Sequence, residues 1–189
     1  MATLYHTGEA VHYWCADESR LGLKTITRRR ITQRGVKPIG QVQWTFQAYY
    51  LYGMIEPLSG DSFFFEFSHL NSFCFQAFLD EFAKAHPQGI HIIQLDNARA
   101  HTAQRLVIPQ NVILWFQPPH APECNPIERF WALLKSRLAW RLFDSLSALQ
   151  DSVSSFLNSF SPSSFASLAG HQSLRQDLHY LGTCNIYMG

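Results

Sequence analysis

Three acidic residues stand where their carboxylates could act together on a phosphate group. Asp17 follows a short strand pattern, Asp96 follows a second one, and Glu128 lies in the first turn of a helical pattern. Carboxylates at the ends of adjacent central strands can converge on one point, as hard divalent cations such as Mg²⁺ require. Two such ions about 4 Å apart would activate the attacking oxygen and stabilise the leaving oxygen of a phosphodiester. The spacing is therefore compatible with metal-dependent phosphodiester chemistry.

Each of these acids also has a purely structural explanation. Asp96 and the residue after it form a common turn or helix-capping pair. Asp17 is close enough in sequence to Arg20 for a salt bridge between them. Glu128 could complete a capping-box-like helix start that Asn125 begins. The individual residues leave both explanations open, and their joint occurrence favours the chemical one.

The segments around these acids predict a mixed sheet. A short strand is expected first, then an aromatic antiparallel hairpin with its turn at residues 56–60, then two further apolar strands. Seen together with intervening helices, this order predicts an α/β fold in which a mixed sheet carries helices on its faces. The expected strands are residues 10–16, 44–55, 61–67, 90–95 and 111–116.

Apolar residues spaced three and four apart predict the helices. One helix is expected to begin at Asn71 as N-cap and to end before Pro87, and a short helical stretch is expected around 100–107. Two more are expected at 126–140 and from 146 to about 157, and the periodicity ends near Ser159. The face of the 126–140 helix that should pack on the sheet consists of Ile127, Phe130, Trp131, Leu134 and Leu138.

The segments that carry the three acids resemble the three signatures of the DDE transposases. They are residues 17–19, 95–101 and 118–131, and the resemblance to the mariner superfamily and its bacterial insertion-sequence relatives covers Tyr13 to Phe160. The resemblance implies a ribonuclease-H-like fold with a mixed five-stranded sheet flanked by helices. Residues 1–160 would form this catalytic domain, and residues 161–189 would form a loosely ordered tail.

The resemblance also implies an activity and a cofactor. Asp17, Asp96 and Glu128 would be the catalytic residues and the metal ligands, with Asp17 bridging two Mg²⁺ ions, for which Mn²⁺ could substitute. The chain would cleave DNA at the ends of a mobile element and join the freed 3′-hydroxyl to target DNA. Two alternatives remain open: a nuclease without strand joining, and an inactive DNA-binding fragment of a split transposase.

The implied partners are element ends, target DNA and a second copy of the chain in a homodimeric DNA complex. Members of the family normally carry helix-turn-helix segments before the catalytic domain. Only about a dozen residues precede the first expected strand here. A separate helix-turn-helix chain is therefore an expected partner for sequence-specific binding.

Basic residues are concentrated after the first strand. Seven of the fifteen Lys and Arg residues fall within positions 20–37, and no acid lies between Glu18 and Glu56. Such a run is either a solvated loop or an electrostatic footprint for phosphate backbones. His101 could touch a substrate phosphate, although a capping or packing role is an equal alternative. The residues expected to contact DNA are Arg28, Arg29, Arg30, Arg34, Lys37 and His101.

The overall composition excludes several classes of protein. A hydrophobic content of 47% with 15% charged residues and a net charge of +1 is typical of a globular chain and excludes global disorder. No apolar stretch approaches the 18 residues of a membrane span, and residues 1–10 lack a secretion signal. The four cysteines are far apart, which favours free thiols in a reducing compartment. The expected location is the bacterial cytoplasm, on nucleoid DNA.

Overall fold

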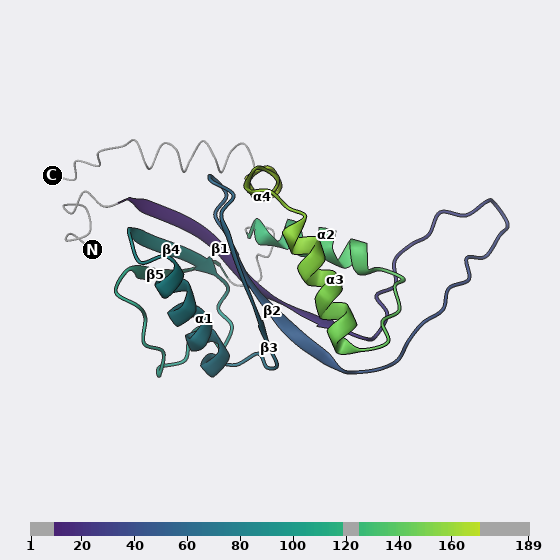
Figure 1. Cartoon of the computed structure of the whole chain (residues 1–189), viewed down its shortest axis with the longest axis horizontal. Helices are drawn as coiled ribbons and strands as arrows, with labels where there is room; N and C mark the ends of the chain where they lie inside the picture. The colour runs from purple at the N-terminus through teal and green to yellow at the C-terminus, as the bar shows by residue number, and fades with distance from the viewer. Residues whose placement is uncertain (1–9, 119–124, 171–189) are drawn as a thin grey trace.

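One mixed five-stranded sheet forms the centre of the protein (Figure 1). The computed structural model describes residues 10–118 and 125–170. The strands lie in the order β3-β2-β1-β4-β5; β3, β2 and β1 are antiparallel, whereas β1, β4 and β5 are parallel. The predicted mixed sheet is therefore confirmed. Its strands are β1 (Val11–Gly22), β2 (Ala48–Ile55), β3 (Ser62–Phe67), β4 (Ile90–Leu95) and β5 (Val112–Phe116).

Four helices cover the two faces of this sheet (Figure 1). Helix α1 lies on one face, and α2, α3 and α4 lie on the other. Within the described ranges, none of these helices has both the length and the apolarity that crossing a membrane requires. The helices are α1 (Ser72–Ala85), α2 (Ile127–Leu138), α3 (Leu146–Asn158) and α4 (Pro162–Ala169).

The central strand β1 is buried on both sides. Successive side chains of a strand point to opposite faces. Trp14 and Ala16 accordingly join the core beneath α1, while Tyr13 and Cys15 join the core beneath the other three helices. A strand that is covered on both faces is held rigidly, and a functional residue placed on it has a defined direction.

The predicted helix starts and faces are largely confirmed. Asn71 caps α1, since its side chain accepts hydrogen bonds from the backbone N–H groups of Phe73 and Cys74. The α2 face predicted to pack on the sheet is buried in full. Asn125, however, is not the N-cap of α2; that position is Pro126, which has no side-chain cap bond.

Three parts of the prediction differ from the structure, and the first is the start of β2, which lies at Ala48 and not at residue 44. β1 continues past the expected end at residue 16 to Gly22, because it pairs with β2 from Cys15 to Gly22 after its pairing with β4 has ended. Residues 100–107 form turns and no helix. Local turn hydrogen bonds link His101 and Thr102 to Ala98, and at the end of the segment Val107 donates to and accepts from the side chain of Gln76 on α1.

The expected tail begins with an ordered helix. α4 lies within residues 161–170, where Ser161 caps it and Phe165 packs into the core. This part of the chain is therefore not a loosely ordered tail, and the β2–β3 turn lies against it. Gly60 in that turn has a φ of 77°, and a Cβ there would lie 1.7 Å from the carbonyl oxygen of Pro162. Residues 171–189 of the expected tail, and residues 119–124 of the third motif, lie outside the described ranges.

Candidate metal and DNA-binding site

Asp17 and Asp96 are brought to corresponding positions on two neighbouring parallel strands. The last paired residues of β1 and β4 are Cys15 and Gln94. Asp17 and Asp96 each lie two residues beyond this pair, and parallel neighbours are separated by about 4.8 Å. The backbone therefore brings both aspartates to the same end of the β1–β4 ladder, with Asp96 one residue past the end of β4. Asp17 is in the interior of β1, not after it.

The carboxylate of Asp17 is held against α2. Its Oδ2 accepts a hydrogen bond from Nε1 of the buried Trp131 at 2.9 Å. Burial and the negative charges of Glu18 and Glu128 raise the pKa of Asp17 to about 7. Because Glu128 contributes to this raised pKa, its carboxylate lies close enough to Asp17 for the two negative charges to repel each other.

The beginning of α2 is tied to the strand that carries Asp17. The side chain of the buried Asn125 donates through Nδ2 to the backbone oxygen of Ala16 at 2.8 Å. Glu128 follows in the first turn of α2. A rigid contact between helix and strand thus fixes the distance between the backbones of Asp17 and Glu128, which a shared ligand set requires.

Asp96 is turned away from Asp17 and toward a buried histidine. Its Oδ1 accepts hydrogen bonds from the backbone N–H of Ala98 at 3.0 Å and from Nδ1 of His101 at 2.8 Å. The bond from His101 is the main reason that the pKa of Asp96 is lowered, although partial burial opposes it. The Asp96 side chain remains half exposed.

His101 bridges Asp96 to a second carboxylate. Its Nε2 lies 2.9 Å from Oε1 of Glu18, and its ring packs 4.4 Å from the ring of Phe75 on α1. Burial alone would lower the pKa of His101, but the hydrogen bonds and charges of Asp96 and Glu18 outweigh it and raise the pKa to about 10. His101 is therefore a buried imidazolium with both nitrogens engaged. The predicted contact with DNA does not suit it, and the alternative of a packing role does.

Adjacent residues on β1 thus face opposite layers of the protein. Asp17 points toward α2, while Glu18 points toward α1 and draws Asp96 to that side through His101. Glu18 was not among the predicted site residues. An acidic pair in mid-strand, with a histidine five residues after Asp96, was the available signal in the sequence.

The carboxylate oxygens of Asp17, Asp96 and Glu128 are of the chemical type that binds Mg²⁺. Carboxylate oxygens are its preferred protein ligands, and a cation beside Asp17 would offset the desolvation that raises the pKa of this residue. Across residues 10–118 and 125–170, however, no three His, Cys, Asp or Glu side chains are grouped closely enough to hold a metal ion. For Asp96 to join Asp17 and Glu128, its side chain must rotate away from His101.

Comparison with known proteins identifies the family. The family model described as "DDE superfamily endonuclease" matches residues 12–150 of the chain. The chain belongs to the DDE superfamily of endonucleases. The resemblance inferred from the three acidic segments is therefore confirmed.

The fold of this DDE domain is also found in solved transposase structures. The Mos1 transposase paired-end complex with left transposon end has a TM-score of 0.68 at 14% identity, covering 89% of this chain and 53% of the Mos1 chain. The crystal structure of the Mos1 mariner paired end complex with Mn has a TM-score of 0.68 at 14% identity, covering 94% and 57%. The likeness confirms the ribonuclease-H-like fold. The DDE domain spans only about half the length of these Mos1 chains.

A curated relative adds sequence similarity over part of the domain. It is the "Uncharacterized protein y4pE/y4sA" of Sinorhizobium fredii (strain NBRC 101917 / NGR234). The identity is 30% over 96 residues, which cover 50% of this chain and 71% of the relative.

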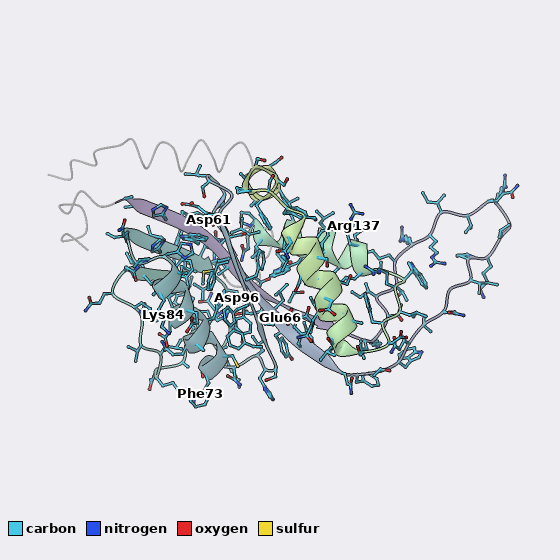
Figure 2. All side chains as sticks on the ribbon, viewed as in Figure 1. Asp61, Glu66, Phe73, Lys84, Asp96 and Arg137 are labelled. Carbon is cyan, nitrogen blue, oxygen red and sulfur yellow. The ribbon has the colours of Figure 1, made fainter. Side chains whose placement is uncertain are left out.

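Six of the basic residues that follow Glu18 lie on a long arm between β1 and β2: Lys24, Arg28, Arg29, Arg30, Arg34 and Lys37. Residues 23–47 reach away from the body of the protein (Figure 1), and hydrogen bonds from Leu23 to Gln47 and from Thr25 to Gln43 close the base of the arm. Figure 2 places Asp96 within the body, at a distance from the tip of the arm. The arm is therefore directed away from Asp96 and does not fold over it.

Two of the predicted DNA contacts have structural partners, one on α2 and one within the arm. Arg28 donates to the backbone oxygen of Ala132 at 3.1 Å, and Arg30 donates to that of Ile39 at 3.0 Å. The guanidinium of Arg30 also lies 4.2 Å from the ring centre of Trp140. The remaining predicted contacts, Arg29, Arg34 and Lys37, are exposed on the arm.

Replacing His101 by glutamine is expected to destabilise the DDE domain by about 3 kcal/mol, because Glu18 stays buried and loses its cationic partner. The folded pKa of about 10 lies above the ordinary value of 6.5. The stabilisation from His101 should therefore be full below pH 6.5 and should decline as the pH rises through about 10. Urea unfolding at several pH values measures both effects.

The matched variant is the double replacement His101→Gln and Glu18→Gln. Removing the buried charge together with its partner should recover part of the lost stability. Equal stability of the wild type and His101→Gln would mean that the bridge does not stabilise the domain.

Proposed function

We propose that this DDE domain is the catalytic domain of a transposase and performs metal-dependent DNA strand cleavage and strand transfer. The observation that carries most weight is the position of Asp17 and Asp96, two residues beyond the last pair of β1 and β4. Glu128 is held nearby by the contact between Asn125 and β1. Membership of the endonuclease superfamily supports the same reaction class.

Asp17, Asp96 and Glu128 are the residues proposed to hold two Mg²⁺ ions, with Mn²⁺ as a substitute. Asp17 would be shared between them, Asp96 would complete one site and Glu128 the other. When bound, the ions supply Lewis-acid activation of the attacking water or 3′-hydroxyl and stabilise the leaving oxygen. A Mos1 complex with Mn supports this choice of cation.

The protein's own contribution is to orient the carboxylates. Trp131 donates to Oδ2 of Asp17 and so fixes the direction of that carboxylate. His101 keeps the Asp96 carboxylate ionised, which a cation ligand must be, and Asp96 would leave this hydrogen bond to join the other two acids. Glu128 projects from the first turn of α2, a rigid element that is tied to β1 through Asn125.

DNA is the proposed substrate, both as element ends and as target. The solved relatives include a paired-end complex with a transposon end, and the exposed basic side chains of the arm are suited to phosphate backbones. The same proposal includes action as a homodimer on DNA and assistance from a separate helix-turn-helix chain. It also places the protein in the bacterial cytoplasm, on nucleoid DNA.

Two reactions with purified protein test this function. The first is nicking of supercoiled plasmid and of duplexes that carry the DNA flanking the gene, with Mg²⁺, Mn²⁺ or EDTA. The second offers pre-cut 3′ ends together with target plasmid and scores joined products. Metal-dependent joining would support the transposase. Cleavage without joining would indicate a nuclease, and metal-independent or absent cleavage would contradict an active catalytic domain.

Binding of DNA through the arm should be weak and governed by salt. If Arg29, Arg34 and Lys37 each meet a phosphate, their replacement by glutamine should flatten the slope of log K against log salt by about 2.7 in total. Fluorescence anisotropy with a labelled duplex over a salt series measures this slope. Lys84→Gln on α1 is a control with one charge removed, and an unchanged slope in the triple variant would mean that these residues only solvate the arm.

A further inference from the structure

A polar pocket lies between the three helices on one face of the sheet, outside the carboxylate site. Its volume is about 530 Å³, within the usual range of ligand sites. Arg137 and Arg141 line it together with the hydroxyl groups of Ser152, Ser159 and Ser164. Leucine and phenylalanine side chains form the rest of the lining. No carboxylate is among the described residues that line this pocket, so its charge is positive.

Arg141 is already oriented in this pocket. Its Nη1 donates to the hydroxyl oxygen of Ser152 at 2.7 Å, and its guanidinium lies 4.9 Å from the ring centre of Phe143. A guanidinium that is fixed in this way loses less side-chain entropy when it binds an anion. Its planar arrangement of N–H groups matches the oxygens of a phosphate.

Stabilisation of the helix end explains only part of this arrangement. Arg137 lies in the last turn of α2, where a cation interacts favourably with the helix dipole. Arg141 lies three residues beyond the end of α2 and is held by α3 and by Phe143 instead. Two cations that line one cavity, without a carboxylate among its described lining residues, are better explained by an anionic ligand.

The surroundings of the pocket favour DNA as the source of that anion. Trp140, next to Arg141, donates through Nε1 to the backbone oxygen of Arg28 at 3.0 Å, and its ring stacks against Arg30. The base of the basic arm therefore meets the end of α2 beside the pocket. Arg137 lies in the last turn of α2, about 13.5 Å along the helix axis from Glu128 in the first turn.

We propose that Arg137 and Arg141 form a second DNA contact, which binds a phosphate of the backbone away from the scissile bond. This inference rests on the proposed function, because it takes DNA as the substrate. The site would hold the duplex between the arm and the carboxylates and would contribute to affinity and placement. It takes no part in the bond-breaking step.

The test is the salt dependence of DNA binding by full-length protein carrying Arg137→Gln, Arg141→Gln or both. Each lost phosphate contact should flatten the slope of log K against log salt by about 0.9, so the double variant should lose about 1.8. The control, Lys84→Gln, removes one charge from α1, on the opposite side of the protein (Figure 2). Thermal unfolding followed by circular dichroism shows whether each variant is folded.

Further measurements separate this inference from the proposed function. One outcome is that the wild type cleaves DNA while the double variant binds DNA with the same affinity and the same slope of log K against log salt as Lys84→Gln. The pocket proposal is then wrong and the proposed function stands. If the double variant loses binding of inorganic phosphate or dAMP but keeps the DNA slope, the pocket serves a free anion and the proposal is again wrong. If cleavage is absent but the double variant flattens the slope, the pocket binds DNA and the proposed activity fails.

Discussion

Replacing Asp96 by asparagine is expected to lower metal-dependent DNA nicking by more than about 100-fold. Residues that merely support metal ligands contribute 10- to 100-fold, so loss of a ligand's charge should cost more. The fold should persist, because an asparagine oxygen can still accept from Ala98 and from His101. The rate of plasmid nicking at fixed Mg²⁺ measures the loss.

The control for this variant is Asp151→Asn. Asp151 is exposed on α3, so its replacement removes the same charge far from the site and should leave nicking unchanged. Circular dichroism and urea unfolding should show both variants folded. Nicking by Asp96→Asn at the wild-type rate would remove Asp96 from the proposed ligand set.

Replacing Trp131 by alanine is expected to destabilise the domain by about 3–5 kcal/mol through the cavity it leaves. The side chain is 1% exposed and packs against Phe64 and Phe130. Gly53 on β2 makes room for the ring, since a Cβ there would lie 2.9 Å from it. The free energy of unfolding in urea measures the loss, and Trp44→Ala on the exposed arm should cost less than about 1 kcal/mol.

Trp131→Phe separates packing from the hydrogen bond to Asp17. Phenylalanine keeps most of the ring volume and removes the N–H donor, so the loss of stability should be much smaller than for alanine. The orientation of Asp17 should still suffer, and metal-dependent nicking should fall by about 10- to 100-fold. If Trp131→Phe nicked DNA at the wild-type rate, the indole N–H would have no part in positioning Asp17.

Elements whose signals lie within one segment could be predicted from the amino-acid sequence. Asn71 and the periodic apolar residues of α1 and α2 predicted those helices, because a cap and a 3.6-residue period are read within a single segment. The apolar strands bounded by Gly89 and Asp96 and by the turn at 56–60 were predicted for the same reason. The acids at the strand ends then indicated that Asp17 and Asp96 should meet on neighbouring strands.

Only the tertiary structure decided how the acids are oriented. Glu18 and His101 are 83 residues apart in the chain, and Trp131 is 114 residues from Asp17. No local period encodes such pairs. They arise because β1 is covered on both faces, so that Asp17 meets α2 while its neighbour Glu18 meets the α1 side.

The same reason explains the boundaries that were predicted wrongly. β1 extends past Asp17 because β2 supplies hydrogen-bond partners that its own residues do not reveal. Val107, at the end of the segment 100–107, bonds to the side chain of Gln76 on α1. The buried Phe165 holds α4 against the core. Local patterns determine which segments are regular. The point at which each segment ends, and the layer its polar side chains face, depend on partners brought together by folding.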